Sequence, residues 1–172
     1  LGVNTMRIAM YSALADDVYG YADGDDAHRA ELEDMMVNAA QYCAKLGIYM
    51  IVDWHILLDP DPNTHMDKAI QFFKNVCPRL AGYDNIVYEI CNEPNTDTTW
   101  AQICNYANNV IPVIREILPE CVIIVGTPVW SQRVDEAAKA PLSYPNLVYT
   151  LHFYADTHKD SLRQLMVDAI KD

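Results

Sequence analysis

The chain has 172 residues, of which 51% are hydrophobic and 21% are charged, so it holds enough apolar material for the core of a globular protein. Its formal net charge of −12 at pH 7 argues against a nucleic acid or an anionic membrane surface as a partner, because both bind basic surfaces. The sequence has no run of eighteen apolar residues and predicts no membrane-spanning segment. Its five cysteines lack Cys-x-x-Cys spacing and are expected to be buried free thiols.

The first half of the chain alternates apolar runs, which predict strands, with segments whose apolar residues recur at i, i+3, i+4 and i+7, which predict helices. The predicted elements are a strand over 3–11, a helix over 27–46, a strand over 48–55 and a helix over 66–80. Gly47 is expected to end the first helix in a left-handed conformation. Tyr19 and Tyr21, in the acidic loop 12–26, are expected to be exposed to a ligand.

The second half continues the same alternation. The predicted elements are a strand over 86–93, a helix over 100–118, a strand over 121–125, a short helix around 132–139, a strand over 147–154 and a helix over 160–170. Pro112 falls inside the second of these segments and is expected to bend or interrupt that helix, because proline removes a backbone donor. No linker or low-complexity stretch divides the chain.

The run over 86–93 is the central stretch of the sequence. Pro94 cannot donate to a strand ladder, so the strand is expected to stop with Glu93 at its C-terminal tip. In parallel α/β proteins the loops at these strand ends surround the site of chemistry. A carboxylate preceded by the amide of Asn92 suits a general acid/base with a neighbour that orients the substrate. Glu93-Pro94-Asn95 is also ordinary turn chemistry, and a surface turn remains the alternative.

Strand–helix alternation with apolar strands predicts a parallel sheet with helices outside it. A doubly wound sheet and a (β/α)8 barrel both fit, but no strand is followed by the G-x-G-x-x-G loop of a dinucleotide binder. The barrel is favoured by polar residues near four strand ends, which share one face by their period of two. These residues are Arg7 and Tyr11, Asp53 and His55, Glu89 and Glu93, and His152 and Tyr154. Each of them taken alone could instead be a satisfied buried polar residue.

Four motifs resemble the strand-end motifs of glycoside hydrolase family 5, most closely those of its bacterial endo-β-1,4-glucanases (cellulases). They are Asp53-Trp54-His55, Tyr88-Glu89-Ile90-Cys91-Asn92-Glu93-Pro94, Val125-Gly126-Thr127 with Trp130-Ser131-Gln132, and His152-Phe153-Tyr154-Ala155. The resemblance runs through the whole chain in order. It implies an α/β fold of the parallel (β/α)8 TIM-barrel type, of which strands two to six, about five β/α units, are present, so that residues 1–172 form one partial catalytic domain.

The same resemblance implies a role for each strand-end residue. Glu93 would be the acid/base, and Asn92 would hold the 2-hydroxyl of the sugar. The polar shell around the reacting centre would consist of Arg7, His55, His152 and Tyr154. Tyr11 would lie near the cleft, and Trp130 would stack on a sugar ring, because an indole offers a large apolar face to the C–H face of a pyranose.

A retaining glycosidase also needs a nucleophilic carboxylate about 5–5.5 Å from the acid/base. In the family this is a glutamate at the tip of the seventh strand, and no glutamate follows Tyr154 in this sequence. Glu89 lies four residues before Glu93, roughly 13 Å away along a strand, and is expected to be buried in the barrel floor. Asp156 and Asp160 remain open as substitutes. The nucleophile is therefore expected to be missing from these residues.

The function implied is retaining hydrolysis of β-1,4-glucosidic bonds, with cellulose or cello-oligosaccharides as the partner. The alternatives are a mannanase or another β-glycanase of the same fold, and a non-catalytic carbohydrate-binding or self-associating remnant. Five parallel strands cannot close a barrel, and their two open edges favour a homo-oligomer. A fragment of a larger enzyme, a truncated self-assembling clone and a decayed homologue remain open as explanations.

No cofactor and no metal are expected, because the histidines stand alone at strand ends without ligand spacing such as H-E-x-x-H. The implied location is secreted or on the surface of a bacterium. The sequence starts with Leu1-Gly2-Val3-Asn4, which is typical of the middle of a domain, and a signal peptide is not in this segment.

Overall fold

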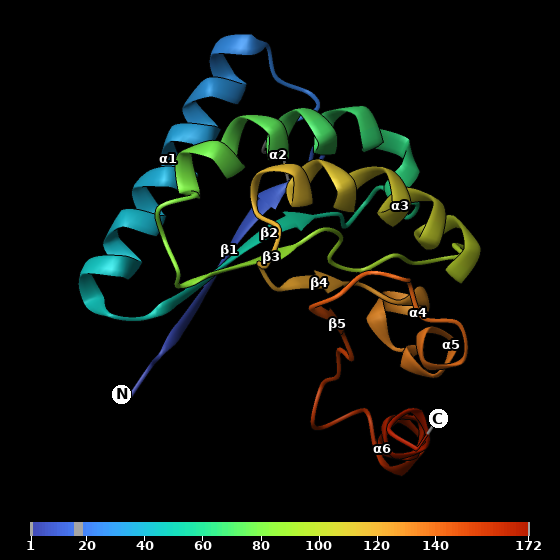
Figure 1. The fold of residues 1–172 in the computed structure, drawn as a ribbon. Coiled ribbons are helices and arrows are strands. Elements are labelled where there is room, and N and C mark those ends of the chain that lie inside the picture. Colours follow the sequence, from blue (N-terminus) through green and yellow to red (C-terminus); the bar gives the residue numbers. More distant parts are fainter. Residues whose placement is uncertain (1, 16–18, 172) are drawn as a thin grey trace.

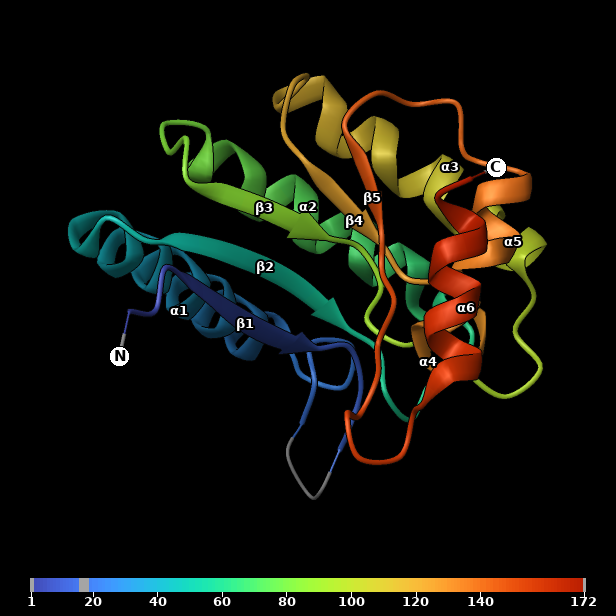
Figure 2. The same ribbon diagram turned by 90° about the horizontal axis from the view of Figure 1, so that it is seen from below.

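The computed structural model describes residues 2–15 and 19–171. Its centre is a five-stranded parallel sheet in which the strands lie in the order of the sequence (Figure 1). The strands are β1 Thr5–Tyr11, β2 Tyr49–His55, β3 Ile86–Glu89, β4 Ile123–Val125 and β5 Leu147–Tyr149. Viewed from below, they fan out as a twisted sheet does (Figure 2). The predicted parallel α/β fold of about five units is confirmed.

Three long helices, α1, α2 and α3, lie side by side over one face of the sheet, whereas α4, α5 and α6 lie on the side of β5 (Figure 1). The helical elements are α1 Asp26–Leu46, the 3-10 turn Pro62–His65, α2 Met66–Leu80, α3 Trp100–Ile117, α4 Pro128–Ser131, α5 Val134–Lys139 and α6 Asp160–Ala169. Gly47 follows α1 with a φ of 67° and donates its backbone N–H to Ala44, so the predicted left-handed cap is confirmed.

The core lies between the sheet and the layer of long helices. Met50, Val52 and Trp54 of β2 are fully buried against this layer, as the period of two requires for one face of a strand. Between them stands Asp53, which points to the opposite face together with Arg7 of β1. The alternation therefore sends apolar side chains to the helices and polar ones to the inner face, where the candidate site is built.

Two predicted strands end earlier than expected. β3 stops at Glu89 and β5 at Tyr149, so Glu93, His152 and Tyr154 lie in the segments beyond them. For β3 the physical reason is that the segment after Glu89 changes its hydrogen-bond partner. The carbonyls of Asn92 and Pro94 accept from the Ser131 hydroxyl and the Trp130 N–H, so the loop after β4 replaces the strand ladder there.

Tyr21 was expected to be exposed, and this is wrong. It is fully buried, and its hydroxyl donates to Glu33 of α1 at 2.5 Å while its ring packs edge-on against Trp54 and Phe72. A phenol that can satisfy its hydroxyl inside the core gains the burial of a large apolar ring. Tyr19 is exposed, as predicted.

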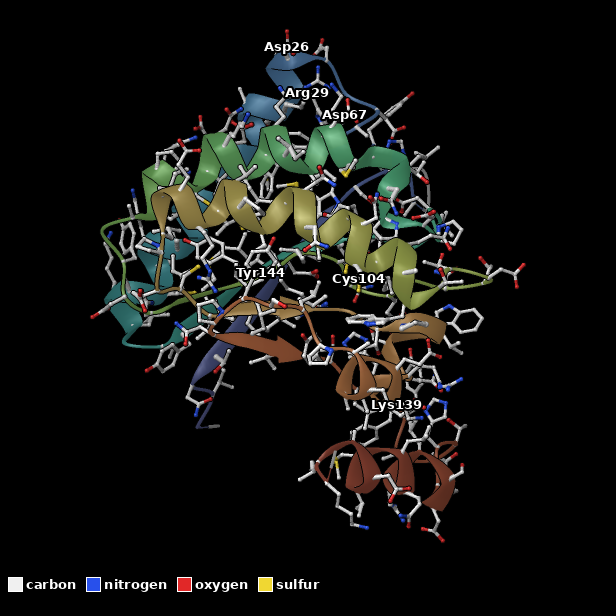
Figure 3. The ribbon with its side chains drawn as sticks, turned by 45° about the vertical axis from the view of Figure 1, so that its right-hand side comes forward. Asp26, Arg29, Asp67, Cys104, Lys139 and Tyr144 are labelled. Carbon is white, nitrogen blue, oxygen red and sulfur yellow. The ribbon has the colours of Figure 1, made fainter. Side chains whose placement is uncertain are left out.

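Pro112 does not interrupt its helix, because α3 runs from Trp100 to Ile117 with the proline on its exposed side. The prediction of buried free thiols holds for three of the five cysteines. Cys43, Cys77 and Cys91 are buried and free, whereas Cys104, on α3 (Figure 3), and Cys121 are free but only partly buried. Within residues 2–15 and 19–171, no helix combines the length and hydrophobicity needed to cross a bilayer.

Candidate active site

A cleft opens where the segments after β3, β4 and β5 meet. It is lined by Leu57, Glu93, Trp130, Gln132, His152, Phe153, Tyr154, Thr157 and His158. Glu93 is the one carboxylate among these lining residues. The cleft lies beyond the C-terminal ends of parallel strands, the position at which α/β folds bind and convert ligands.

Glu93 and His152 form the central pair of the cleft. Glu93 Oε1 lies 2.8 Å from His152 Nδ1, and the two side chains are 23% and 27% exposed. A carboxyl group with an imidazole on one oxygen keeps its other oxygen free for a ligand. Partial exposure leaves this oxygen accessible for a proton transfer, which is what a general acid/base requires.

Asn92 precedes Glu93 in the chain and is almost completely buried. Its Oδ1 accepts from Arg7 Nη2 at 2.8 Å, and its Nδ2 donates to the carbonyl of Ile56 at 3.0 Å. A third contact, from Nδ2 to His55 Nε2, is longer at 3.3 Å. The amide is therefore held on two sides, and one of its hydrogens makes only a long contact.

Arg7 is held by two buried carboxylates. Its Nε and Nη2 donate to the two oxygens of Glu89 at 2.7 and 2.9 Å, a bidentate pair, and Nη2 also lies 3.0 Å from Asp53 Oδ2. Burial raises the pKa of Glu89, and its hydrogen bond from Arg7 opposes this rise. Glu89 is thus buried beneath the strand ends, as predicted, and its carboxylate accepts both hydrogen bonds of the bidentate pair with Arg7.

His55 donates or accepts at both ring nitrogens within this network. Its Nδ1 lies 2.6 Å from Asp53 Oδ2, and the ring of Tyr11 packs over it with centroids 4.6 Å apart. Asp53 belongs to one of the strand-end motifs of the sequence, but no role was predicted for it. The signal that could have found it is its position two residues before His55 on the same face of a strand.

The loop after β4 carries Trp130 in an unusual backbone conformation. Val129, Trp130 and Ser131 have φ of 57°, 54° and 55°, so α4 is a left-handed turn. Such a conformation is costly for non-glycine residues, and most of all for a β-branched one, and it persists only where surrounding contacts hold it. The turn leaves the Trp130 side chain 45% exposed at the cleft.

Ser131 supplies several of those contacts. Its hydroxyl donates to the Asn92 carbonyl at 2.7 Å and accepts from the Thr127 N–H at 3.2 Å. Its own carbonyl accepts from the His152 N–H at 2.7 Å. This buried serine therefore joins the segment that carries Glu93 to the segment that carries His152, and sequence reasoning assigned it no role.

Replacing this hydroxyl should lower stability. Ser131→Ala is expected to reduce the free energy of unfolding by about 1–3 kcal/mol, because two buried backbone groups lose their partner. Chemical denaturation measures the loss. Ser143→Ala, at an exposed position, should remain close to the unaltered protein, and an equal effect of the two substitutions would contradict this role of Ser131.

Tyr154 differs from the other predicted site residues. It lines the cleft, but it is 76% exposed, and its described hydrogen bonds, to Thr157 and His158, are all made by its backbone. The structure thus brings Glu93 and His152 together, and places Arg7, Asn92 and His55 in one network, with the Tyr11 ring tilted against His55. It places Tyr154 and Trp130 at the cleft without direct contact between their side chains and that network.

The two aspartates left open as a second carboxylate point elsewhere. Asp156 and Asp160 have fully exposed side chains that face Lys159 and Arg163, and neither lines the cleft. In the part of the chain that the structure describes, no group of three or more His, Cys, Asp or Glu side chains is placed to hold a metal ion.

The Glu93–His152 pair lies beyond the C-terminal ends of parallel strands, the place where (β/α)8-barrel enzymes such as glycoside hydrolases carry out their chemistry. Comparison with known families supports this class. The family model described as cellulase (glycosyl hydrolase family 5) matches residues 1–171. The chain therefore belongs to glycosyl hydrolase family 5.

Curated relatives are similar along nearly the whole chain. Endoglucanase A of Butyrivibrio fibrisolvens is 41% identical over 171 residues, which cover 99% of this chain and 39% of that protein. An endoglucanase of Clostridium saccharobutylicum is 46% identical over 163 residues, or 94% of this chain and 35% of that protein. The chain thus spans less than two fifths of the length of these relatives.

Solved structures give the same result for the fold. The catalytic domain of Thermobifida fusca endoglucanase Cel5A superposes with a TM-score of 0.88 at 37% identity, covering 98% of this chain and 54% of that chain. A form of the same Thermobifida fusca domain is described in complex with cellotetraose, with a TM-score of 0.87 at 38% identity over 96% of this chain and 54% of that one. The chain spans about half the length of these structures, and its fold is that of part of their TIM barrel.

Proposed function

We propose that residues 1–172 are part of the catalytic domain of a retaining endo-β-1,4-glucanase and carry its acid/base, Glu93. The observation that carries the proposal is the 2.8 Å contact between Glu93 Oε1 and His152 Nδ1 in the cleft. The names of the relatives support a β-1,4-glucan as substrate, and so does the cellotetraose bound by the Thermobifida fusca relative.

In this mechanism Glu93 acts twice. It first donates a proton to the glycosidic oxygen as the bond to the leaving sugar breaks, and it then removes a proton from the water that hydrolyses the glycosyl–enzyme intermediate. His152 supports both states if its Nδ1 carries a proton, because it then donates to Oε1 and leaves the other carboxyl oxygen to carry the transferred proton. The contact at 2.8 Å also holds the Glu93 side chain in one orientation.

The buried network positions the sugar. Asn92 has one hydrogen bonded to Ile56, and its second hydrogen, with only the long contact to His55, is the one available to the 2-hydroxyl of a glucosyl ring. Hydrogen bonds to this hydroxyl that strengthen in the transition state contribute several kcal/mol to glycosidase catalysis. Arg7 fixes the opposite side of the same amide.

The nucleophile is proposed to come from outside residues 1–172. Glu93 is the one carboxylate among the described residues that line the cleft, and Glu89 is committed to Arg7. The Glu93 proton donor therefore works with a second carboxylate supplied by a longer polypeptide. Such a protein is proposed to be secreted or displayed at a bacterial surface, because an insoluble glucan is reached only there.

Substrate class is tested by assaying reducing-end release from soluble β-1,4-glucan and from β-1,4-mannan with a longer form that contains this segment. A preference for the glucan supports the proposal, and a preference for the mannan would make the protein a mannanase. Binding of both polymers without release of reducing ends from either would show a carbohydrate-binding remnant.

Trp130 is expected to stack on a glucosyl ring. Trp130→Ala should weaken binding of a cello-oligosaccharide by about 1 kcal/mol, or about fivefold in Kd, because the exposed indole loses its contact with the sugar face. Isothermal titration calorimetry measures the change. Tyr42→Ala removes an exposed aromatic of α1 outside the cleft and should leave Kd unchanged. A Trp130→Ala protein with unaltered Kd would contradict the assignment.

The isolated 172-residue chain is expected to be nearly inactive and to self-associate. Two apolar grooves flank the sheet, one between β1 and α1 and one beside α6. The first is lined by Ile8, Met10, Leu32, Met35, Met36 and Ala39, and the second by Leu151, Phe153, Leu162 and Met166. Another copy can bury such surfaces. Light scattering coupled to size exclusion tests this, and a monomer with robust glucan hydrolysis would contradict it.

A further inference from the structure

Asp53 is a buried carboxylate that the proposed mechanism does not use. Its side chain is 0% exposed, so it cannot touch a sugar in the cleft. Both of its described polar contacts go to Oδ2, which faces His55 and Arg7, while Oδ1 has no hydrogen-bond partner among the described residues. Burying a carboxylate costs desolvation free energy, so its contacts with Arg7 and His55 indicate its role.

The orientation of the Asn92 amide follows from its neighbours. Arg7 Nη2 can only donate, so the amide atom that faces it must be the oxygen. The carbonyl of Ile56 can only accept, so the amide atom that faces it must be the nitrogen. A flipped amide would oppose donor to donor and acceptor to acceptor, and is excluded.

The protonation of His55 follows in turn. Because the Asn92 nitrogen is a donor, the ring nitrogen that faces it, Nε2, has to be the acceptor. The proton of the neutral ring then lies on Nδ1, which donates to Asp53 Oδ2 at 2.6 Å. An ionised carboxylate can only accept, so Asp53 favours this tautomer and opposes the other.

Arg7 has nearer hydrogen-bond acceptors than Asp53, although the Asp53 charge also stabilises the guanidinium. Nη2 has two hydrogens, and the shorter contacts of this atom go to Asn92 at 2.8 Å and Glu89 at 2.9 Å. Asp53 Oδ2, at 3.0 Å, is a third acceptor around the same nitrogen. Its nearer partner is the His55 ring.

We propose that Asp53 is a positioning residue that holds His55 as the Nδ1–H tautomer, so that Nε2 accepts from Asn92 and the single ring N–H is donated to Asp53. The consequence for the sugar rests on the proposed function. The second amide hydrogen of Asn92 then makes only the long contact with His55 Nε2, and it can also donate to a sugar hydroxyl. Asp53 thereby determines which groups the network presents to the substrate, without touching it.

The test is a ¹⁵N NMR spectrum of the imidazole rings in this chain, labelled at histidine, with His55 assigned from a His55→Gln sample. In the unaltered protein we expect a neutral His55 with a pyrrole-type Nδ1 and a pyridine-type Nε2. A ring with its proton on Nε2, or on both nitrogens, overturns the proposal. This measurement needs neither a substrate nor an active enzyme, so its result is separate from that of the proposed function.

Two variants show whether Asp53 is the cause. In Asp53→Leu the acceptor is absent, and we expect loss of the Nδ1–H pattern at His55 together with a shift of the Asn92 side-chain amide signals. Asp135→Leu removes a mostly buried aspartate of α5 that pairs with Arg133 and with Lys139, labelled in Figure 3, and the His55 pattern should stay unchanged. A His55 pattern in Asp53→Leu that matches the unaltered protein overturns the proposal.

Discussion

Glu93→Gln should lower the hydrolysis of cellulose-type substrates by ~10²–10⁴-fold in any active form of this protein, because the amide cannot donate a proton to the leaving sugar. Its shape and its contact with His152 Nδ1 are retained, so the fold should survive. The measurement is kcat/KM on a cello-oligosaccharide. Glu31→Gln alters an exposed glutamate of α1 and should leave the rate unchanged.

Leaving-group dependence separates loss of the acid from general damage. A substrate with a good leaving group barely needs the proton in the glycosylation step, so that step should be slowed much less by Glu93→Gln. An equal loss on good and poor leaving groups would point to a disturbed site. Hydrolysis of cellulose-type substrates at the unaltered rate would show that Glu93 is not the proton donor.

Arg7→Met is expected to have the largest effect on stability. The substitution leaves the carboxylates of Glu89 and Asp53 buried and close to each other without their cation. Removing one partner of a buried ion pair costs about 3–5 kcal/mol, and the partial exposure of Arg7 places the loss near the lower end, about 3 kcal/mol. Chemical denaturation at neutral pH measures it.

The effect should depend on pH with a definite sign. Burial already raises the pKa of Glu89, and removal of Arg7 takes away the hydrogen bond that opposes the rise. A carboxyl group whose folded pKa lies above its unfolded value destabilises the fold at higher pH, and this penalty disappears as pH falls below the unfolded value. Arg7→Met should therefore cost less at acidic pH. Adding Glu89→Gln should recover part of the loss at neutral pH, and a double variant no more stable than Arg7→Met would contradict the account.

Local patterns predict most of the fold. The helices and strand positions follow from periodicity in single segments, and Gly47 ends α1 as its sequence position indicates. The approach of Glu93 and His152 is also predictable, because parallel strands carry their C-terminal residues to one edge of the sheet. Alternation within strands likewise predicts that Arg7, Asp53 and Glu89 share one face of the sheet.

The remaining features depend on contacts between distant segments. The sequence around Tyr21 shows only an aromatic residue in an acidic loop, which predicts exposure. The acceptor that allows its burial, Glu33, lies on another element. The end of β3 and the left-handed turn at Val129 are set jointly by the Ser131 and Trp130 hydrogen bonds to the Asn92–Pro94 segment. No short window of sequence contains both sides of these contacts.

The central claim, that Glu93 is the acid/base of a retaining glucanase, is tested most directly by azide rescue. In an active longer form with Glu93→Ala, hydrolysis of an activated aryl β-cellobioside should stall at the glycosyl–enzyme, and azide should release it because this anion needs no general base. The account predicts a faster rate and a β-cellobiosyl azide product. An α-cellobiosyl azide, which would make Glu93 the nucleophile, or no effect of azide on the variant, would contradict it.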